Sequence, residues 1–323
     1  MKLLKFISSF ILFSASSHVL GAQYLQSADI VGTGFYDAFH FEDKPDPTHG
    51  RVTYVNESTA QALNLTYASS DTFILRTDYT TYLQPSDPGR NSVRIVSNLQ
   101  YTTFAAIFDM RHMPEGCGTW PAVWTVGADW PNQGEVDIVE GVNSMMPNVA
   151  SVHTGSNCKM PSSGRNMSGV STGVNCATYE TNGAGCGIEF TDTPNDPRSF
   201  GPGFNSHSGG WYAFERTNSD FKIWFWSRSD RAVPDEVQYG PRAIDTTTWG
   251  EPIGHWTDDL CDFASHFGPH NIVINLALCG DWAGNYYVYK SSGCPDTCEE
   301  FVNTNPAALY AAYFDFVSIK IYT

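Results

Sequence analysis

The sequence predicts an all-β protein built as a sandwich or a barrel. Short runs of β-branched and aromatic residues recur along the 323 residues, separated by Gly, Pro, Asn and Asp, and long amphipathic helical patterns are missing. Some runs alternate, so that Phe221 and Ile223 face one way and Trp224 and Trp226 face the other. So many strands must form two sheets that fold over each other to bury their inner faces.

The expected strands are short and follow one another along the whole chain. The last is expected to place Val317, Ile319 and Ile321 on one face. Residues 158–210 are rich in Gly, Ser and Asn and predict long cross-linked loops. These loops either form a wall of a binding cleft or are a disulfide-linked surface segment without a role in binding. The predicted strands cover residues 51–56, 72–83, 92–98, 102–113, 120–127, 135–142, 149–154, 211–217, 221–228, 271–280 and 314–323.

Residues 1–22 have the features of a secretory signal peptide. Lys2 and Lys5 precede an apolar stretch that serines interrupt, and the small residues Gly21 and Ala22 lie near a plausible cleavage point. A membrane span needs about 20 apolar residues in a row, which this stretch does not offer. We therefore expect a secreted, extracellular protein without a membrane anchor, in which residues 23–323 form a single domain and a monomer.

The net charge of the chain bears on which partners it could bind. Without the leader, 16 basic residues stand against 34 acidic ones, a formal net charge of −18 that repels phosphate backbones and argues against nucleic acid as a partner.

Eight cysteines behind a signal peptide predict disulfides, whose pairing the sequence leaves open. Zinc at Cys294 and Cys298 is a weaker alternative, because no second ligand pair completes a site. Asn56, Asn64 and Asn166 begin N-glycosylation triplets.

The run "GEVDIVEGVN" at 134–143 gathers three carboxylates, those of Glu135, Asp137 and Glu140. In a strand Glu135 and Asp137 share a face, whereas strict alternation would put Glu140 on the opposite face. We therefore predict a β-bulge, one extra residue in the strand that returns Glu140 to the face of the other two. The glutamate carboxyls would then lie about 5–5.5 Å apart, the separation of a retaining glycosidase.

Neighbouring tryptophans favour a sugar-hydrolysing site over its alternatives. Trp120, Trp124 and Trp130 precede the acids, and an indole face stacks well on a sugar ring. Calcium ligation and a solvated strand edge remain open from these residues alone. Val136 and Val139 can bury the other face of the strand, which argues against a solvated edge.

On these residues the chain resembles glycoside hydrolase family 16, whose core pattern is E-x-D-x-x-E. The longer run "GTWPAVWTVGADWPNQGEVDIVEGVN" is similar to the fungal laminarinase-type endo-1,3(4)-β-glucanases, and "LALCGDWAG" extends the likeness. The resemblance implies a concanavalin A-like β-jelly-roll sandwich of two antiparallel sheets with a concave sugar-binding cleft. It implies hydrolysis of β-1,3 and mixed β-1,3/1,4 glucans such as laminarin, without a cofactor. Asp315 could contribute to a structural calcium site, which stays unassigned.

The resemblance also implies roles for individual residues. Glu135 is expected to be the nucleophile, Glu140 the acid/base and Asp137 the helper of the nucleophile, which predicts a bell-shaped pH profile with an acidic optimum. Two rivals remain open, a β-glucan transglycosylase and a non-catalytic β-glucan-binding lectin on the same fold. No metal ligand is assigned, and the substrate-binding positions implied are Trp124, Trp130, His153, Trp282, Arg94 and Asn56.

Overall fold

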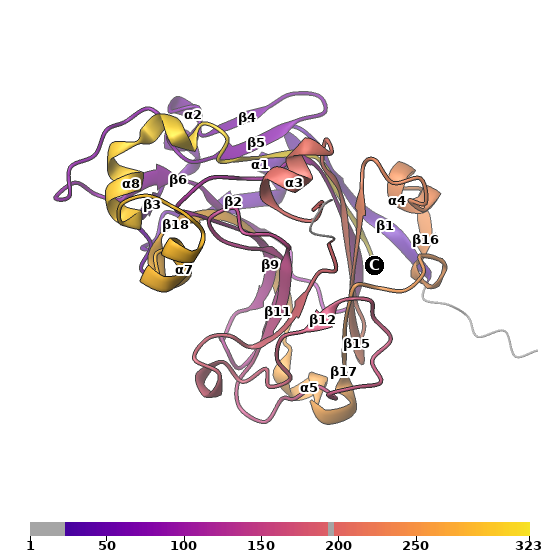
Figure 1. Ribbon diagram of the computed structural model, residues 1–323. Helices are drawn as coiled ribbons and strands as arrows, with labels where there is room; N and C mark the ends of the chain where they lie inside the picture. The colour runs from indigo at the N-terminus through magenta and orange to yellow at the C-terminus, as the bar shows by residue number, and fades with distance from the viewer. Residues whose placement is uncertain (1–22, 193–196) are drawn as a thin grey trace, which may run out of the picture.

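The computed structural model describes residues 23–192 and 197–323, and its body is two stacked antiparallel sheets (Figure 1). The fold class predicted from the short alternating runs is therefore confirmed. The predicted signal peptide lies outside the described residues and stays a prediction. No helix in the described residues is long and apolar enough to cross a membrane.

One sheet carries the acidic strand near its centre. Its eight strands among the described residues run, in spatial order, β12 (Val170–Ser171), β13 (Cys186–Glu189), β11 (Val149–His153), β10 (Glu135–Glu140), β9 (Thr119–Gly127), β18 (His270–Leu278), β7 (Arg94–Ser97) and β2 (Phe39–Phe41). Every pairing in this order is antiparallel. Neighbours such as β9 and β18 are far apart in the chain, so residues from distant segments meet on one face.

The second sheet covers the back of the first. Seven of its nine strands form the path β16 (Ala243–Asp245), β1 (Gln23–Ile30), β19 (Tyr313–Tyr322), β8 (Phe104–His112), β14 (Gly210–Arg216), β15 (Asp220–Ser227) and β17 (Gly254–Thr257), and β5 (Phe73–Arg76) with β4 (Thr66–Ala68) joins at β19. A small parallel pair is formed by β3 (Val52–Tyr54) and β6 (Arg90–Ser92). The short helices are α1 (Gly34–Ala38), α2 (Glu57–Ala62), α3 (Gly201–Ser206), α4 (Asp235–Tyr239), α5 (Phe263–His266), α6 (Gly280–Ala283), α7 (Tyr286–Ser291) and α8 (Cys298–Thr304).

The main core fills the space between the sheets. From the acidic strand, Val136, Ile138 and Val139 are fully buried in it, and Phe221 and Ile223 enter it from the second sheet. Trp224 lies on β15 with Phe221 and Ile223 but on the opposite face, as the alternation predicted. It belongs to a separate apolar cluster under the segment 233–249. Burying each large apolar side chain contributes about 1.5–3 kcal/mol, which anchors the acidic strand against the second sheet.

The predicted orientation of the last strand is wrong at its start. The register between β19 and β8 shifts between Phe316 and Ser318, so Phe316 packs in the main core. Val317 is instead half-buried beside Arg111 on the outer side, whereas Ile319, which was predicted to share a face with Val317, packs in the core. An irregularity in pairing changes which face a residue takes, and period-two counting does not detect it.

Several other expectations change in detail. The strand predicted over 72–83 ends at Arg76, because the Asp78 carboxylate accepts hydrogen bonds from the backbone N–H groups of Thr80 and Thr81 and turns the chain. Short strands with little apolar pattern were not predicted, and these are β1, β2, β4, β6, β12, β13, β16 and β17.

Four disulfides join all eight cysteines. Their pairs are Cys117–Cys294, Cys158–Cys261, Cys176–Cys186 and Cys279–Cys298. Cys117–Cys294 links the start of β9 to the segment after α7, and Cys279–Cys298 links the end of β18 to the start of α8. The other two disulfides cross-link the stretch 158–210. Since Cys294 and Cys298 bond to different partners, the zinc interpretation is wrong. The three asparagines of the glycosylation triplets are all exposed.

Candidate active site

A β-bulge brings the three carboxylates of β10 to one face. Asp137 pairs with Trp124 of β9 and Val139 pairs with the preceding residue, Val123, so Ile138 is the extra residue. Glu135, Asp137 and Glu140 all line the same cleft. The predicted bulge is confirmed, and the acids share a face that strict alternation would have denied them.

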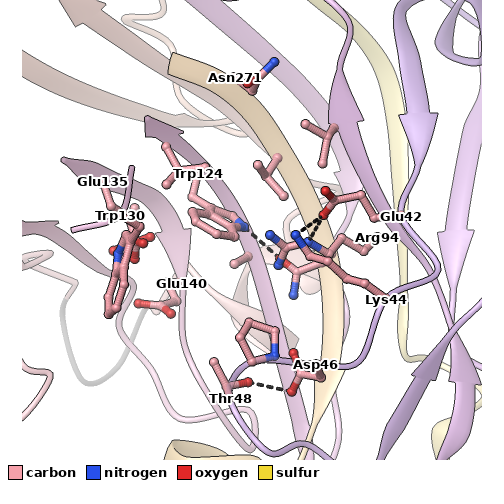
Figure 2. Close-up of a pocket in the computed structure, with 18 of the residues that line it drawn as sticks. Glu42, Lys44, Asp46, Thr48, Arg94, Trp124, Trp130, Glu135, Glu140 and Asn271 are labelled. Carbon is pink, nitrogen blue, oxygen red and sulfur yellow. Dashed lines mark hydrogen bonds and ion pairs between the residues drawn. The ribbon is translucent and has the colours of Figure 1, made fainter. Parts of the chain in front are cut away.

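The cleft has a volume of about 480 Å³ and lies over β10, β9, β18 and β7, with the segment 42–48 at its side. Figure 2 shows Trp130 next to the two glutamates and Trp124 between them and Arg94. Three tryptophans of the 120–130 region line it, as the sequence suggested. Aromatic walls with a few polar groups are typical of carbohydrate and other small-ligand sites.

The indole of Trp124 is held by polar contacts on both sides. Its Nε1 donates to Asn275 Oδ1 at 2.7 Å, and Asn275 Nδ2 donates to the hydroxyl of Tyr54 at 3.1 Å. The Arg94 guanidinium lies 4.9 Å from the ring centroid and donates to Glu42 Oε2 at 2.7 Å. Because these partners fix the ring, its face is preorganised for a ligand.

Glu140 is held by a second tryptophan. Trp120 Nε1 donates to Glu140 Oε1 at 2.9 Å, and the Trp282 ring packs edge-on against Trp120 with centroids 5.7 Å apart. Trp282 lies on the short helix α6 rather than on a strand, and its ring contact with Trp120 places it beside the cleft. An indole N–H orients a carboxyl group and stabilises its ionised form.

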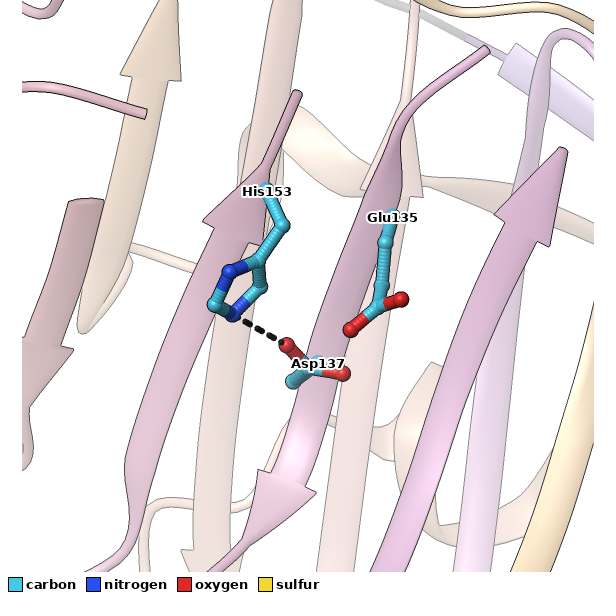
Figure 3. A group of neighbouring side chains, drawn as sticks. All are labelled: Glu135, Asp137 and His153. Atoms are coloured by element: carbon cyan, nitrogen blue, oxygen red, sulfur yellow. Dashed lines mark ion pairs between the residues drawn. The ribbon is translucent and has the colours of Figure 1, made fainter. Parts of the chain in front are cut away.

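Asp137 forms the link between Glu135 and His153 (Figure 3). His153, from β11, stands opposite Glu135 in the sheet, and its Nε2 lies 3.2 Å from Asp137 Oδ2. One donor atom from each of these three side chains lies within 4.8 Å of the others, so on distance the trio could hold a metal ion. The same closeness lets an imidazole compensate negative charge on the two carboxylates.

All three acids have raised pKa values. Burial is the largest cause and raises the pKa of Glu135, Asp137 and Glu140 to about 8 each. The Asp137 charge raises the pKa of both glutamates further, whereas hydrogen bonds with Trp130 and Trp120 lower the pKa of Glu135 and Glu140 respectively. Near neutral pH the cluster therefore retains protons, as a site combining an acid with a base requires.

Comparison with known proteins identifies the family. Residues 39–322 match the model described as the XgeA-like, catalytic domain of glycoside hydrolase family 16. The chain belongs to glycoside hydrolase family 16. Among solved structures of this family, laminarinase 16A from Phanerochaete chrysosporium, bound to two β-glucans in donor and acceptor sites, is 50% identical, with a TM-score of 0.91 over 94% of this chain and 100% of that one.

Other family 16 relatives differ in activity and length. An endo-1,3(4)-β-glucanase of Emericella nidulans is 37% identical over 98% of this chain and 50% of its own length. A probable glycosidase of Schizosaccharomyces pombe is 38% identical over 90% of this chain and 67% of its own length. The chain thus spans about half the length of several curated relatives. A structure of an elongating family 16 β-1,3-glucosyltransferase is 35% identical, with a TM-score of 0.84 over 93% of this chain and 100% of that one.

Asn56 does not lie in the family 16 cleft of this chain. It is exposed and caps α2, where its Oδ1 accepts from the backbone N–H of Thr59 at 3.0 Å. A substrate-binding role for Asn56 is therefore not supported. Asp315, the position considered for calcium, accepts a hydrogen bond from Arg111 Nε at 3.1 Å, so its carboxylate already has a cationic partner.

The cleft also contains residues that the sequence analysis did not assign. On β18, Asn271 and Asn275 face the cleft, whereas Ile272, Ile274 and Leu276 enter the core. That alternation was visible in the sequence and would have found both asparagines. The segment 42–48 had no such signal, because it is irregular and reaches the cleft only through tertiary packing.

Proposed function

We propose that this family 16 chain is a secreted, monomeric, retaining endo-β-glucanase that hydrolyses β-1,3 and mixed β-1,3/1,4 glucans such as laminarin. The observation that carries the proposal is the bulge at Ile138, which gathers three carboxylates, one buried and two half-buried, on one face in an aromatic cleft. The relatives that act on or bind β-glucans support this substrate class.

In the proposed reaction a Glu135 oxygen attacks the anomeric carbon while the bond to the leaving glucosyl oxygen breaks. Glu140 gives its proton to that oxygen, and the first product leaves. Glu140, now ionised, takes a proton from water as the water attacks the glucosyl ester, which frees Glu135 and reprotonates Glu140. Two displacements at one carbon retain the β-configuration. When Asp137, beside His153, is ionised, its negative charge opposes the ionisation of Glu140.

Two substitutions are expected to move the alkaline limb of kcat/KM in opposite directions. Activity falls as pH rises through the pKa of Glu140, about 8, because the acid loses the proton it donates. Asp137→Asn removes a negative neighbour, lowers that pKa and moves the limb to lower pH by about 1 unit. Trp120→Phe removes a hydrogen bond to the carboxylate and moves it to higher pH. Profiles from pH 4 to 10 on laminarin measure both shifts, and parallel shifts would contradict the assignment of Glu140.

Trp124→Ala is expected to raise KM for laminarin about tenfold with little change in kcat. The indole offers its face to a sugar ring in both ground and transition states, so its loss removes uniform binding. Tyr239→Ala, a change at an exposed tyrosine on α4 outside the cleft, serves as the control and should leave KM unchanged. A fall in kcat without a change in KM would assign Trp124 a different role.

The function is tested on laminarin, lichenan, cereal β-glucan, agar and xyloglucan with a reducing-sugar assay. We expect release of reducing ends from the first three, and proton NMR of the earliest product should show the β-anomer. A folded protein that binds these glucans and cuts none would support the lectin alternative. Early accumulation of the α-anomer would contradict a retaining mechanism.

A transglycosylase is the second candidate, favoured by the likeness to the elongating β-1,3-glucosyltransferase. Both reactions share the glucosyl-enzyme and differ only in whether water or a sugar hydroxyl attacks it. Mass spectrometry of products from laminariheptaose distinguishes them. Products that are all shorter than seven units indicate hydrolysis. A series longer than seven units, formed beside the short fragment that leaves in the first step, indicates transfer.

A further inference from the structure

Asn148 occupies the place where a strand partner of β10 is missing. The backbone of β11 pairs with β10 from Glu135 to Asp137 and no further. Beyond that point the side chain of Asn148, which immediately precedes β11, takes over. Its Nδ2 donates to the carbonyl oxygen of Ile138 at 3.0 Å, and its Oδ1 accepts from the backbone N–H of Glu140 at 2.9 Å.

The primary amide thus imitates a peptide group across the bulge. A bulge interrupts the ladder and leaves backbone groups without a strand partner, and such groups are costly when buried. Asn148 satisfies one carbonyl and one N–H on the two sides of Val139 at once. Because both contacts come from one planar group, they fix the relative orientation of Ile138 and Glu140.

Asn148 is itself held rigidly. It is fully buried, its backbone N–H donates to Ser199 Oγ at 3.0 Å, and its carbonyl oxygen accepts from the backbone N–H of Phe190 at 3.0 Å. Ser199 Oγ in turn donates to Asp192 Oδ2 at 2.6 Å. Both backbone groups and both side-chain polar atoms of Asn148 are therefore engaged, so it has no alternative partner to turn toward.

We propose that Asn148 is a positioning residue that holds the bulge in the form that aims Glu140 into the cleft. It acts through Glu140 and does not touch the substrate. The inference rests on the proposed function, since it assigns its effect to proton donation by Glu140. Trp120 orients the carboxyl end of Glu140, and Asn148 orients its backbone.

The test compares two substrates for Asn148→Ala. Cleavage of laminarin needs a proton on the leaving sugar, whereas a 2,4-dinitrophenyl β-laminaribioside has a leaving group that departs without one. Because kcat/KM reports the steps up to the glucosyl-enzyme, a misplaced Glu140 should lower it about 100-fold on laminarin and less than about 5-fold on the aryl glycoside. Glu140→Gln provides the reference pattern, a large loss on laminarin and a small one on the aryl substrate.

Asn205→Ala is the matched control. The Asn205 amide accepts from the backbone N–H of Met113 at 2.9 Å and donates to the Met113 carbonyl oxygen at 3.0 Å and to Glu115 Oε2 at 2.8 Å, and it does not line the cleft. Its loss removes the same two kinds of hydrogen bond, so we expect equal losses on both substrates of about twofold or less. If Asn148→Ala lowered kcat/KM equally on both substrates, or left it unchanged on laminarin, the positioning role would be wrong.

Failure of the proposed glucanase function can be told apart from failure of the role proposed for Asn148. If the wild type cut neither substrate, the glucanase assignment would fail whatever Asn148 does. If Asn148→Ala does not fold by circular dichroism, Ser199→Ala replaces it, because this change removes the hydroxyl that accepts from the Asn148 backbone and donates to Asp192, and leaves the Asn148 side chain intact. It should lower kcat/KM about threefold on laminarin and leave the aryl glycoside unchanged. Equal effects on both substrates would overturn the proposal.

Discussion

Glu135→Gln is expected to lower kcat on laminarin by about 10⁴-fold or more, with binding of laminarin changed only a few-fold. Glutamine keeps the shape of the side chain but offers no carboxylate to attack the anomeric carbon. The tryptophans of the cleft remain in place, and one carboxylate fewer leaves Asp137 and Glu140 with less repulsion. Initial rates by reducing-sugar assay, together with calorimetric titration of laminari-oligosaccharides, measure the two effects.

Azide distinguishes the nucleophile from the acid/base. Added azide should restore activity to Glu135→Ala, whose small side chain leaves room for azide to attack the anomeric carbon directly, and the product should then be an α-glycosyl azide. In Glu140→Gln, azide should attack the glucosyl-enzyme and give a β-glycosyl azide from the aryl substrate. Near-normal rates on laminarin in either variant, or azide products of the opposite configuration, would contradict the assignments.

Replacing Cys117 and Cys294 by serine is expected to lower the free energy of unfolding by about 4–5 kcal/mol. This disulfide closes a loop of 177 residues, and cross-linking a long loop removes much entropy from the unfolded chain. It also ties the start of β9 to the segment after α7, so its loss frees one end of the cleft. Urea unfolding under oxidising conditions, followed by tryptophan fluorescence, gives the difference.

The Cys176–Cys186 disulfide is the internal control for that result. It closes a separation of only 10 residues, so removing both of its cysteines should cost about 2–3 kcal/mol. If the short-loop variant lost as much stability as the long-loop variant, native packing rather than chain entropy would account for the effect. Catalytic rates at 25 °C should fall more for the Cys117 and Cys294 pair, because Cys117 lies just before β9, whose Trp120 donates a hydrogen bond to Glu140.

Much of the site was predictable because its information is local. Glu135, Asp137 and Glu140 lie within six residues, and the period of a strand shows at once that a bulge is needed for them to share a face. Trp120 and Trp124 lie on β9, the strand that directly precedes β10 in the chain and pairs with it as a hairpin. Even so, counting alone did not reveal the second irregularity at Val317, because no cluster of acids marked it.

The remainder depended on which distant segments meet. Asn56 belongs to a helix cap although it was expected to contact substrate, and Trp282 lies on a helix against Trp120 rather than on a strand. Glu42 reaches the cleft because β2, which it follows, pairs with β7 beside β18 and β9, a long-range arrangement that no local pattern reports. The partners of the cysteines were undetermined for the same reason.

By itself the sequence determined the all-β class, the acidic strand with its bulge, and the presence of disulfides, since each follows from spacing within a few residues or from composition. Only the tertiary structure decided the strand order, the cysteine pairs, the network around Trp124 and the support of Glu140 by Asn148. The physical reason is that backbone alternation is a property of neighbouring residues, whereas burial, pKa values and the pairing of lone backbone groups depend on whatever the folded chain brings alongside.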